Sequence, residues 1–535
     1  MKGEQKMKNR WIYQMACGLV GGLSLCLTAC EDYEAMNVDP NNATLVTAPM
    51  LMSGAEKLVF DCITDVYTGG RFFRYFPQYW ASRAYADEAL YSYQQNIISD
   101  FFNDCYLGIS NLQQVIELNS NPATAASNAA YGANCNQIAA AKILKVWLME
   151  AITDLWGDVP YRDVAQLEQG VYYTRYDRQE EIYQGMLQEL KEAVAMIDPS
   201  QPAFPSGTDQ IYDGDAAKWK RFGNSLRCRL AVHLSKVDPH WRDYITEAVA
   251  DGVFESIDDN ALYAFSSAGS EYSGFYEIFF VRNRNDFTLS RPFALLLLGQ
   301  SDTLNGKQHP WEGVEDPRIS IYTTSNNGSY KGVGYGLPAS KIASGREGTP
   351  NWSVNPPFFL GKDFSYPLMT YAELQFILSE YKGFSKEEYR QGVRASIRAL
   401  AIHTLTDLSE EQVFAYIDKV SERVDAEAVA TQKYIELYLN GIEGWNELRR
   451  TGYPTMVLRP GEISDRIDGE DVRFVPMVEV KGDVISRMIY PDSESTLNAE
   501  NWSEAVSRLQ DGTNNRYSRM YWDARKSTYD HPANK

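Results

Sequence analysis

Residues 48–66 have the sequence APMLMSGAEKLVFDCITDV, in which apolar side chains recur every three or four positions. This spacing places them on one face of an α-helix that packs against a core. The same period recurs in the segments 97–118, 128–156, 179–197, 216–236, 367–381, 387–402, 410–418 and 426–450. The pattern predicts a mainly α protein in which short turns join helices into pairs, as in a tetratricopeptide-like scaffold.

The N-terminus resembles a bacterial lipoprotein signal. A basic start is followed by an apolar run over residues 11–27 and by Leu27-Thr28-Ala29-Cys30, which resembles a lipobox. An uncleaved membrane anchor is the alternative, because the run approaches the length of a spanning helix. The small residues before Cys30 favour cleavage and lipidation of that cysteine, with Glu31 and Asp32 as an acidic tag for surface export.

Two other regions lack a helical period. Residues 253–365 are rich in Gly, Ser, Asn and Pro, and residues 453–535 contain prolines between short apolar runs such as 472–480. The expected organisation is a signal peptide (1–29), a lipidated tether (30–47), a helical scaffold (48–252), a loop-rich insertion that carries the probable ligand face (253–365), the scaffold continued (366–452) and an irregular C-terminal region (453–535).

Composition excludes several classes of protein. The 535 residues include 51 Lys and Arg against 71 Asp and Glu, which leaves a net charge of −20 and disfavours nucleic-acid binding. The hydrophobic share of 44% and the charged share of 23% are those of a globular protein rather than a polytopic membrane protein. Tyrosine is unusually frequent, at 35 residues, and its amphipathic ring suits surfaces and clefts.

Signals for metals, cofactors and catalysis are weak. Cys62, Cys105, Cys135 and Cys228 remain in the mature chain without a Cys-x-x-Cys motif, so we expect buried thiols, and any disulfide pairing stays open. No His-Glu-x-x-His, Gly-x-Ser-x-Gly, P-loop or dinucleotide fingerprint is present. We therefore predict no cofactor, no metal and no catalytic residue, although a glycosidase carboxylate pair stays open among so many acidic residues.

Four blocks resemble the SusD/RagB family, in its second SusD-like subgroup. They are DLWGDVPY (154–161), DAAKWKRFGNSLR (215–227), YPLMTYAE (366–373) and the segment from QKYI to WNELRRTGYP (432–454). The resemblance implies a non-enzymatic surface lipoprotein that binds a nutrient, usually a glycan and sometimes a peptide. It also implies a tetratricopeptide-like scaffold and a SusC-like TonB-dependent outer-membrane barrel as partner.

The same blocks have local structural meanings. Gly157 and Pro160 predict the end of a helix, and Asp215 predicts an N-cap at the start of another. Arg449 and Arg450 end the last long helix, where positive charge favours its C-terminal carbonyl groups. These residues are expected to stabilise the fold rather than to bind a ligand.

Ligand contacts are expected from aromatic residues outside the regular helix faces. A sugar ring needs a flat aromatic surface surrounded by polar groups. The segment after the first helix supplies Trp80, Arg83 and Tyr85, and the insertion supplies Tyr276, Arg282 and Trp352. The resemblance supports the first segment, because the founding starch binder draws contacts from that region. Packing in the core is the alternative for each residue, and a surface-anchored glycoside hydrolase or a peptide-binding lipoprotein is the alternative for the function.

Overall fold

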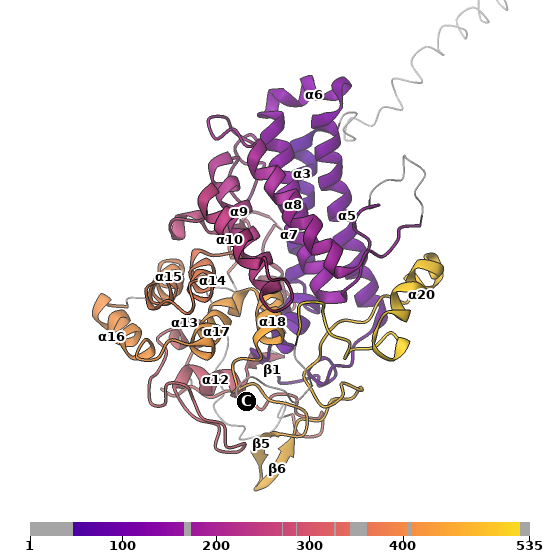
Figure 1. Cartoon of the computed structure of the whole chain (residues 1–535). Helices are drawn as coiled ribbons and strands as arrows, with labels where there is room; N and C mark the ends of the chain where they lie inside the picture. Colours follow the sequence, from indigo (N-terminus) through magenta and orange to yellow (C-terminus); the bar gives the residue numbers. More distant parts are fainter. Residues whose placement is uncertain are drawn as a thin grey trace, which may run out of the picture. The chain divides into compact units, whose positions relative to one another are not determined.

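The computed structural model describes residues 46–164, 173–269, 271–284, 286–325, 328–342, 361–404 and 408–524, with the side chains of 402–404 excepted. The predictions for Cys30 and Trp352 lie outside these residues. The description below concerns residues 48–535, which form one unit. The strands are short and helices predominate, so the predicted mainly α class is confirmed (Figure 1).

The first half of the scaffold consists of long helices that pack in sequence order. They are α3 (Ala48–Thr64), α5 (Gln95–Ser120), α7 (Asn134–Trp156), α8 (Gln179–Met196), α9 (Ala216–His233) and α10 (Trp241–Asp251). Each packs against the next, with α6 (Pro122–Asn128) between α5 and α7. In Figure 1, α3, α5, α7 and α8 stand together as one bundle. The period of the sequence predicted every one of these long helices except α10.

The second half consists of α14 (Tyr371–Tyr381), α15 (Lys386–Thr404), α16 (Glu410–Val420), α17 (Ala426–Glu436) and α18 (Gly441–Thr451). It joins the first half because α14 packs on α9 and α18 packs on α7. The predicted helix over 426–450 is two helices, separated by a 3₁₀ turn at Leu437–Leu439. Asn440 then caps α18, and Gly441 lies so close to Phe73 that a Cβ would stand 1.5 Å from the Phe73 carbonyl oxygen.

Three two-stranded antiparallel sheets lie in the less regular parts of the described structure. They are β1 (Trp80–Ser82) with β3 (Phe287–Leu289), β2 (Ala261–Ala264) with β4 (Ser365–Met369), and β5 (Ile463–Ile467) with β6 (Glu470–Arg473). Of the strand-like run 472–480, only its first two residues belong to a strand.

Short helices complete the described structure. They are α4 (Phe73–Tyr75), α11 (Gly274–Tyr276), α12 (Arg291–Leu298), α13 (Ile319–Tyr322), α19 (Glu494–Leu497), α20 (Ala499–Ser507), the π-helical turns η1 (Thr68–Phe72) and η7 (Glu277–Val281), and the 3₁₀ turns η2 (Glu88–Leu90), η3 (Ala129–Tyr131), η5 (Leu234–Lys236), η6 (Ile257–Asp259), η8 (Leu437–Leu439) and η9 (Gln510–Gly512). Within the described ranges no helix combines the length and the apolar character needed to cross a membrane.

The predicted helix ends are confirmed. The Asp215 side chain accepts the Lys218 backbone N–H at 3.1 Å, and Gly157 follows α7 with a φ of +84° that suits glycine. The two arginines make contacts beyond the end of α18, and Arg450 pairs with Glu380 of α14 at 2.7 Å. Arg449 donates to the carbonyl oxygens of Ser486 and Asp154, on other segments, and thereby ties α18 to its neighbours.

A buried pair of carboxyl groups joins α3 to the loop before α9. Glu56 and Asp209 are both buried. Glu56 Oε2 accepts the Gln210 N–H at 2.9 Å, and Asp209 accepts the Trp219 indole N–H at 2.7 Å. Burial, and then the charge of Asp209, raise the pKa of Glu56 well above its ordinary value. Glu56 therefore holds its proton to a higher pH than an exposed glutamate does.

Candidate ligand-binding face

The pairing of β1 with β3 brings the two predicted ligand segments together. Trp80 lies opposite Leu289 and Ser82 opposite Phe287, and the Arg83 backbone N–H donates to the Asp286 carbonyl oxygen at 2.7 Å. The residues that follow β1 and those that precede β3 therefore share one face of the protein. Among the described residues, this face contains every side chain predicted to bind the ligand except Trp80.

Trp80 is fully buried, with 0% of its surface exposed. Its ring centroid lies 6.2 Å from those of Phe275 and Phe279, and its indole N–H donates to the Tyr438 hydroxyl at 2.7 Å. This burial corrects the expectation of direct ligand contact, because no part of the ring is open to a sugar. Trp80 instead packs against the apolar side of the segment formed by α11 and η7.

Tyr85 is exposed, but cations occupy its surroundings. The guanidinium carbons of Arg71 and Arg284 each lie 5.2 Å from its ring centroid, and Arg71 also lies 4.7 Å from the ring of Tyr67. The half-buried Arg83 lies two residues before Tyr85, and burial lowers its pKa. These rings and cations form a polar border to the face rather than an open stacking surface.

Tyr276 belongs to a row of three aromatic rings spaced four residues apart. Its ring centroid lies 5.1 Å from that of Tyr272 and 5.2 Å from that of Phe280, which is 55% exposed. We call Tyr272, Tyr276 and Phe280 the aromatic ladder. Lys362 Nζ lies 5.3 Å from the Tyr276 ring centroid. The sequence pattern led us to name Tyr276 only, although the four-residue spacing of Tyr272 and Phe280 around it was a usable signal.

Arg282 lies beside the aromatic ladder in a cavity of about 210 Å³, which we call the ladder pocket. Arg282 pairs with Glu277 at 2.7 Å. The pocket is lined by Asp61, Asp65, Val66, Tyr272, Gly274, Glu277, Ile278 and Arg282. Gly274 is required there, since a Cβ would stand 2.3 Å from the Thr64 carbonyl oxygen at the end of α3. The pocket therefore combines one ladder ring with charged groups of both signs.

Two larger cavities lie elsewhere. One, of about 370 Å³, is formed by α5, α7, α8 and residues 161–164, and it includes the ion pair between Lys145 and Glu189 at 2.6 Å. The other, of about 520 Å³, is formed by residues 305–310 with side chains from 423–427 and 455–462. Neither cavity is lined by a residue that the sequence singled out for ligand contact.

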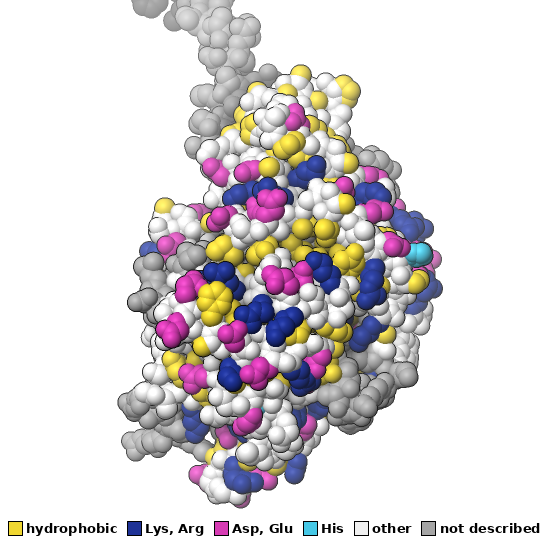
Figure 2. All heavy atoms as spheres, turned by 60° about the vertical axis from the view of Figure 1, so that its left-hand side comes forward, with side chains coloured by type: hydrophobic (Ala, Val, Ile, Leu, Met, Phe, Trp, Pro, Cys, Tyr) yellow, Lys and Arg dark blue, Asp and Glu magenta, His cyan; other side chains and the backbone are white. Residues whose placement is uncertain are grey.

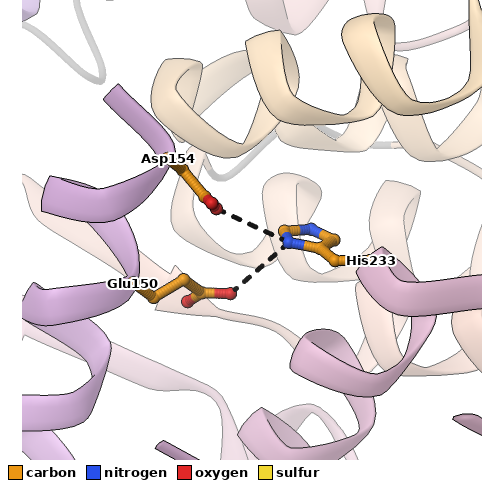
Figure 3. A group of neighbouring side chains, drawn as sticks. All are labelled: Glu150, Asp154 and His233. Atoms are coloured by element: carbon orange, nitrogen blue, oxygen red, sulfur yellow. Dashed lines mark ion pairs between the residues drawn. The ribbon is translucent and has the colours of Figure 1, made fainter. Parts of the chain in front are cut away.

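Glu150, Asp154 and His233 form a buried cluster whose ligand atoms lie within 4.8 Å of one another (Figure 3). Figure 3 shows the two carboxylates of α7 directed toward the imidazole of α9. His233 Nδ1 lies 3.5 Å from Asp154 Oδ2, and Nε2 lies 3.0 Å from Glu443 Oε1. Burial alone lowers the pKa of His233, but the charges of Glu443 and Asp154 outweigh it and raise the pKa to about 10.

His233 is therefore a cation rather than a neutral metal ligand. The Tyr183 hydroxyl lies 2.9 Å from His233 Nδ1 and donates to Asp154 at 2.7 Å, so it already occupies the side of the imidazole on which a metal would bind. The cluster continues through Arg229, which pairs with Glu373 at 2.7 Å, and through Lys433, which pairs with Glu447 at 3.0 Å. This buried ionic network links the blocks that carry the family resemblance, and it serves the fold.

The side of the molecule turned forward in Figure 2 has mixed charge. Acidic and basic side chains alternate there, with no extensive area of one sign. On α15 and α16 the two signs pair directly, as in Arg390 with Asp418 at 2.7 Å. Phe414 is partly exposed there beneath the guanidinium of Arg394. Such pairing stabilises helix packing modestly and offers no strongly charged surface to a partner.

Known proteins share this architecture. The model of the SusD-like_2 family, described as "Starch-binding associating with outer membrane", matches residues 40–491. A solved chitin-binding protein is 26% identical, with a TM-score of 0.70 over 88% of this chain and 99% of that chain. A SusD homolog from Parabacteroides distasonis is 23% identical, with a TM-score of 0.71 over 89% and 97% of the two chains.

A SusD-like protein from Bacteroides thetaiotaomicron is 21% identical, with a TM-score of 0.67 over 90% of this chain and 99% of that chain. No curated protein matched the sequence. These similarities span nearly the whole of each solved chain, so they concern the complete fold rather than one part of it.

Proposed function

The chain belongs to the SusD-like family, and from that premise we propose that it binds an oligosaccharide at the cell surface and delivers it to a SusC-like TonB-dependent barrel. The family is one of outer-membrane-associated binding proteins, described by starch binding. The finer proposal concerns the ligand, the delivery and the partner. It includes a lipid anchor at Cys30, outside the described residues, and a role without catalysis.

The aromatic ladder beside the ladder pocket is the observation that carries this proposal. The exposed ring of Phe280 offers an apolar surface to the C–H face of a sugar. The neighbouring Arg282 and Glu277 offer a donor and acceptors for hydroxyl groups. The similarity to a solved chitin-binding protein supports a glycan ligand and makes oligomers of N-acetylglucosamine the first to test.

The expected organisation of the chain agrees with this proposal. The ladder and Arg282 lie within residues 253–365, proposed as the ligand face, while the long helices lie within 48–252 and 366–452, proposed as the scaffold. Arg83 and Tyr85 border the face from the scaffold side. We propose that these two residues contact the parts of a longer oligosaccharide that extend beyond the ladder.

Calorimetry with a panel of oligosaccharides tests ligand binding. Phe280→Ala is expected to weaken binding about fivefold to tenfold, because it removes one stacking surface. Phe414→Ala is the matched control, since it removes another partly exposed ring at a distant site. Binding that is unchanged in Phe280→Ala would move the site elsewhere, and absence of binding to any oligosaccharide or peptide would contradict the function.

Two further measurements test the remaining parts of the proposal. The membrane-anchored protein should co-purify with a TonB-dependent barrel, and its absence from such a complex would contradict delivery.

Mass spectrometry of the bound oligosaccharide after long incubation should find its length unchanged. Shortened products would instead favour the surface-anchored hydrolase, for which the carboxylates of the ladder pocket would supply the acid and the nucleophile or base.

A further inference from the structure

The ladder pocket has an excess of negative charge. Lys57 pairs with Asp61 at 2.7 Å and with Glu271 at 2.9 Å, and Arg282 pairs with Glu277. Asp65 makes no close ion pair within the described part of the chain, although its charge acts on Arg282 in the same pocket, and its Oδ1 accepts the Tyr67 N–H at 2.8 Å. Among the residues that line the pocket, three carboxylates (Asp61, Asp65 and Glu277) against Arg282 leave a charge of −2, and Lys57 and Glu271, outside the lining, cancel each other.

The backbone adds to this charge. The helix α3 ends at Thr64, so its C-terminal carbonyl groups and the negative end of its dipole lie beside Asp61 and Asp65. The nearby cation Lys362 lies over the ladder rings and does not line the pocket. A bound cation would therefore gain from both the side chains and the helix end, whereas a neutral hydroxyl group would gain little from either.

The position of this charge relative to the ladder indicates the kind of cation. Tyr272 is a ladder ring and also a wall of the pocket. A pyranose stacked on the ladder would hold one of its ring substituents at the pocket entrance. The cavity of about 210 Å³ admits such a substituent but is smaller than the usual site for a whole drug-sized ligand.

We infer that the ladder pocket selects sugars with an unsubstituted, positively charged amino group, such as the glucosamine units of a deacetylated glycan. This inference rests on the proposed function and specifies its substrate class. The ammonium group donates to Asp65 while the sugar ring lies against the ladder. An N-acetylated unit lacks the charge, so it loses this interaction and keeps only the stacking.

Binding of three hexasaccharides of equal length, made of glucosamine, N-acetylglucosamine or glucose, tests the inference. The purified protein should bind the glucosamine hexamer about tenfold more tightly than the other two in low salt at mildly acidic pH, where the amino groups are charged. High salt should reduce this preference, because the charges at the pocket entrance are screened.

Asp65→Asn removes the charge of Asp65 while keeping an acceptor for the Tyr67 N–H, so it should remove most of the preference for the glucosamine hexamer over the acetylated one. Glu500→Gln, an exposed change on α20, is the matched control and should leave the preference unchanged. Circular dichroism of both variants verifies that they are folded.

Each other result overturns a defined part of the inference. Equal or tighter binding of the acetylated hexamer contradicts the substrate class and leaves the proposed function standing. A preference that survives in folded Asp65→Asn contradicts the site. Equally tight binding of a lysine-rich peptide contradicts the assignment to an amino sugar. Failure to bind any of the three hexasaccharides or other glycans contradicts the inference and the proposed function together.

Discussion

Replacing Glu56 by Gln should stabilise the protein at neutral pH. In the native protein Glu56 is buried beside Asp209, and burial raises its pKa well above the ordinary value. In the unfolded chain the same carboxyl group has its ordinary pKa of 4.5 and is ionised at pH 7. At a pH between the unfolded and the folded pKa, folding therefore takes up a proton, which costs free energy. Glutamine has nearly the shape of the protonated acid and is neutral at every pH, so the variant avoids this cost.

The size of the effect follows from the pH. Because the folded pKa is raised, the contribution of Glu56 to stability is fully present below pH 4.5 and is lost as pH rises toward the folded pKa. The loss is about 1.4 kcal/mol per pH unit between 4.5 and the folded pKa, so its total grows with the size of the pKa shift. In the variant Glu56→Gln, the new amide oxygen would still accept the Gln210 N–H, and the amide NH₂ group would face Asp209.

Urea unfolding of the wild type and Glu56→Gln at pH 5, 6 and 7, followed by circular dichroism, measures this effect. The difference in unfolding free energy should grow by about 1.4 kcal/mol per pH unit above pH 4.5 until the pH reaches the folded pKa of Glu56. Glu500→Gln should show no such growth, because its side chain is exposed. A variant that is equally stable at pH 7, or a difference that is independent of pH, would refute protonation of buried Glu56.

Three other changes test particular contacts. Trp80→Ala should destabilise the protein by about 3–5 kcal/mol in urea unfolding, because it removes a large buried side chain. Trp80→Phe should keep most of the glycan affinity in calorimetry. A large loss of affinity in folded Trp80→Phe would favour direct contact between Trp80 and the glycan. Between pH 7 and 10 the free energy of unfolding of the wild type should fall by about 4 kcal/mol as His233 gives up its proton, because a group with a raised pKa stabilises the fold only while it is protonated. His233→Arg should abolish this part of the loss. An unchanged pH profile in both proteins would contradict a charged His233. Gly441→Ala should destabilise by about 3 kcal/mol through its clash with the Phe73 carbonyl group, and unaltered thermal unfolding would show that α18 can shift.

The helical scaffold was predictable because its signal is local. Long helices such as α3 and α5 carry their apolar period within one continuous segment, and Asp215 and Gly157 mark helix ends through side-chain and backbone preferences that need no partner. The break between α17 and α18 was missed, since it depends on the approach of Gly441 to a residue nearly 370 positions earlier.

The candidate site was only partly predictable. An aromatic residue has the same sequence signal whether it lies in the core or on a surface, so Trp80 and Tyr276 could not be told apart. The pairing of β1 with β3 decided the matter, because it placed Trp80 beneath the segment that carries the ladder. The ladder pocket likewise depends on the docking of 272–282 against the end of α3, which no local pattern encodes.

The pairing of β1 with β3 also has a consequence for the order of folding. Its partner residues Trp80 and Leu289 are more than 200 positions apart in the chain, and most of the first helical bundle lies between them. Contacts between distant residues form late, since closing a long loop costs entropy that helix packing can first reduce. The ligand face should therefore be assembled after the bundle. A chain whose bundle is incomplete would then expose no binding site that competes with the folded protein for the ligand.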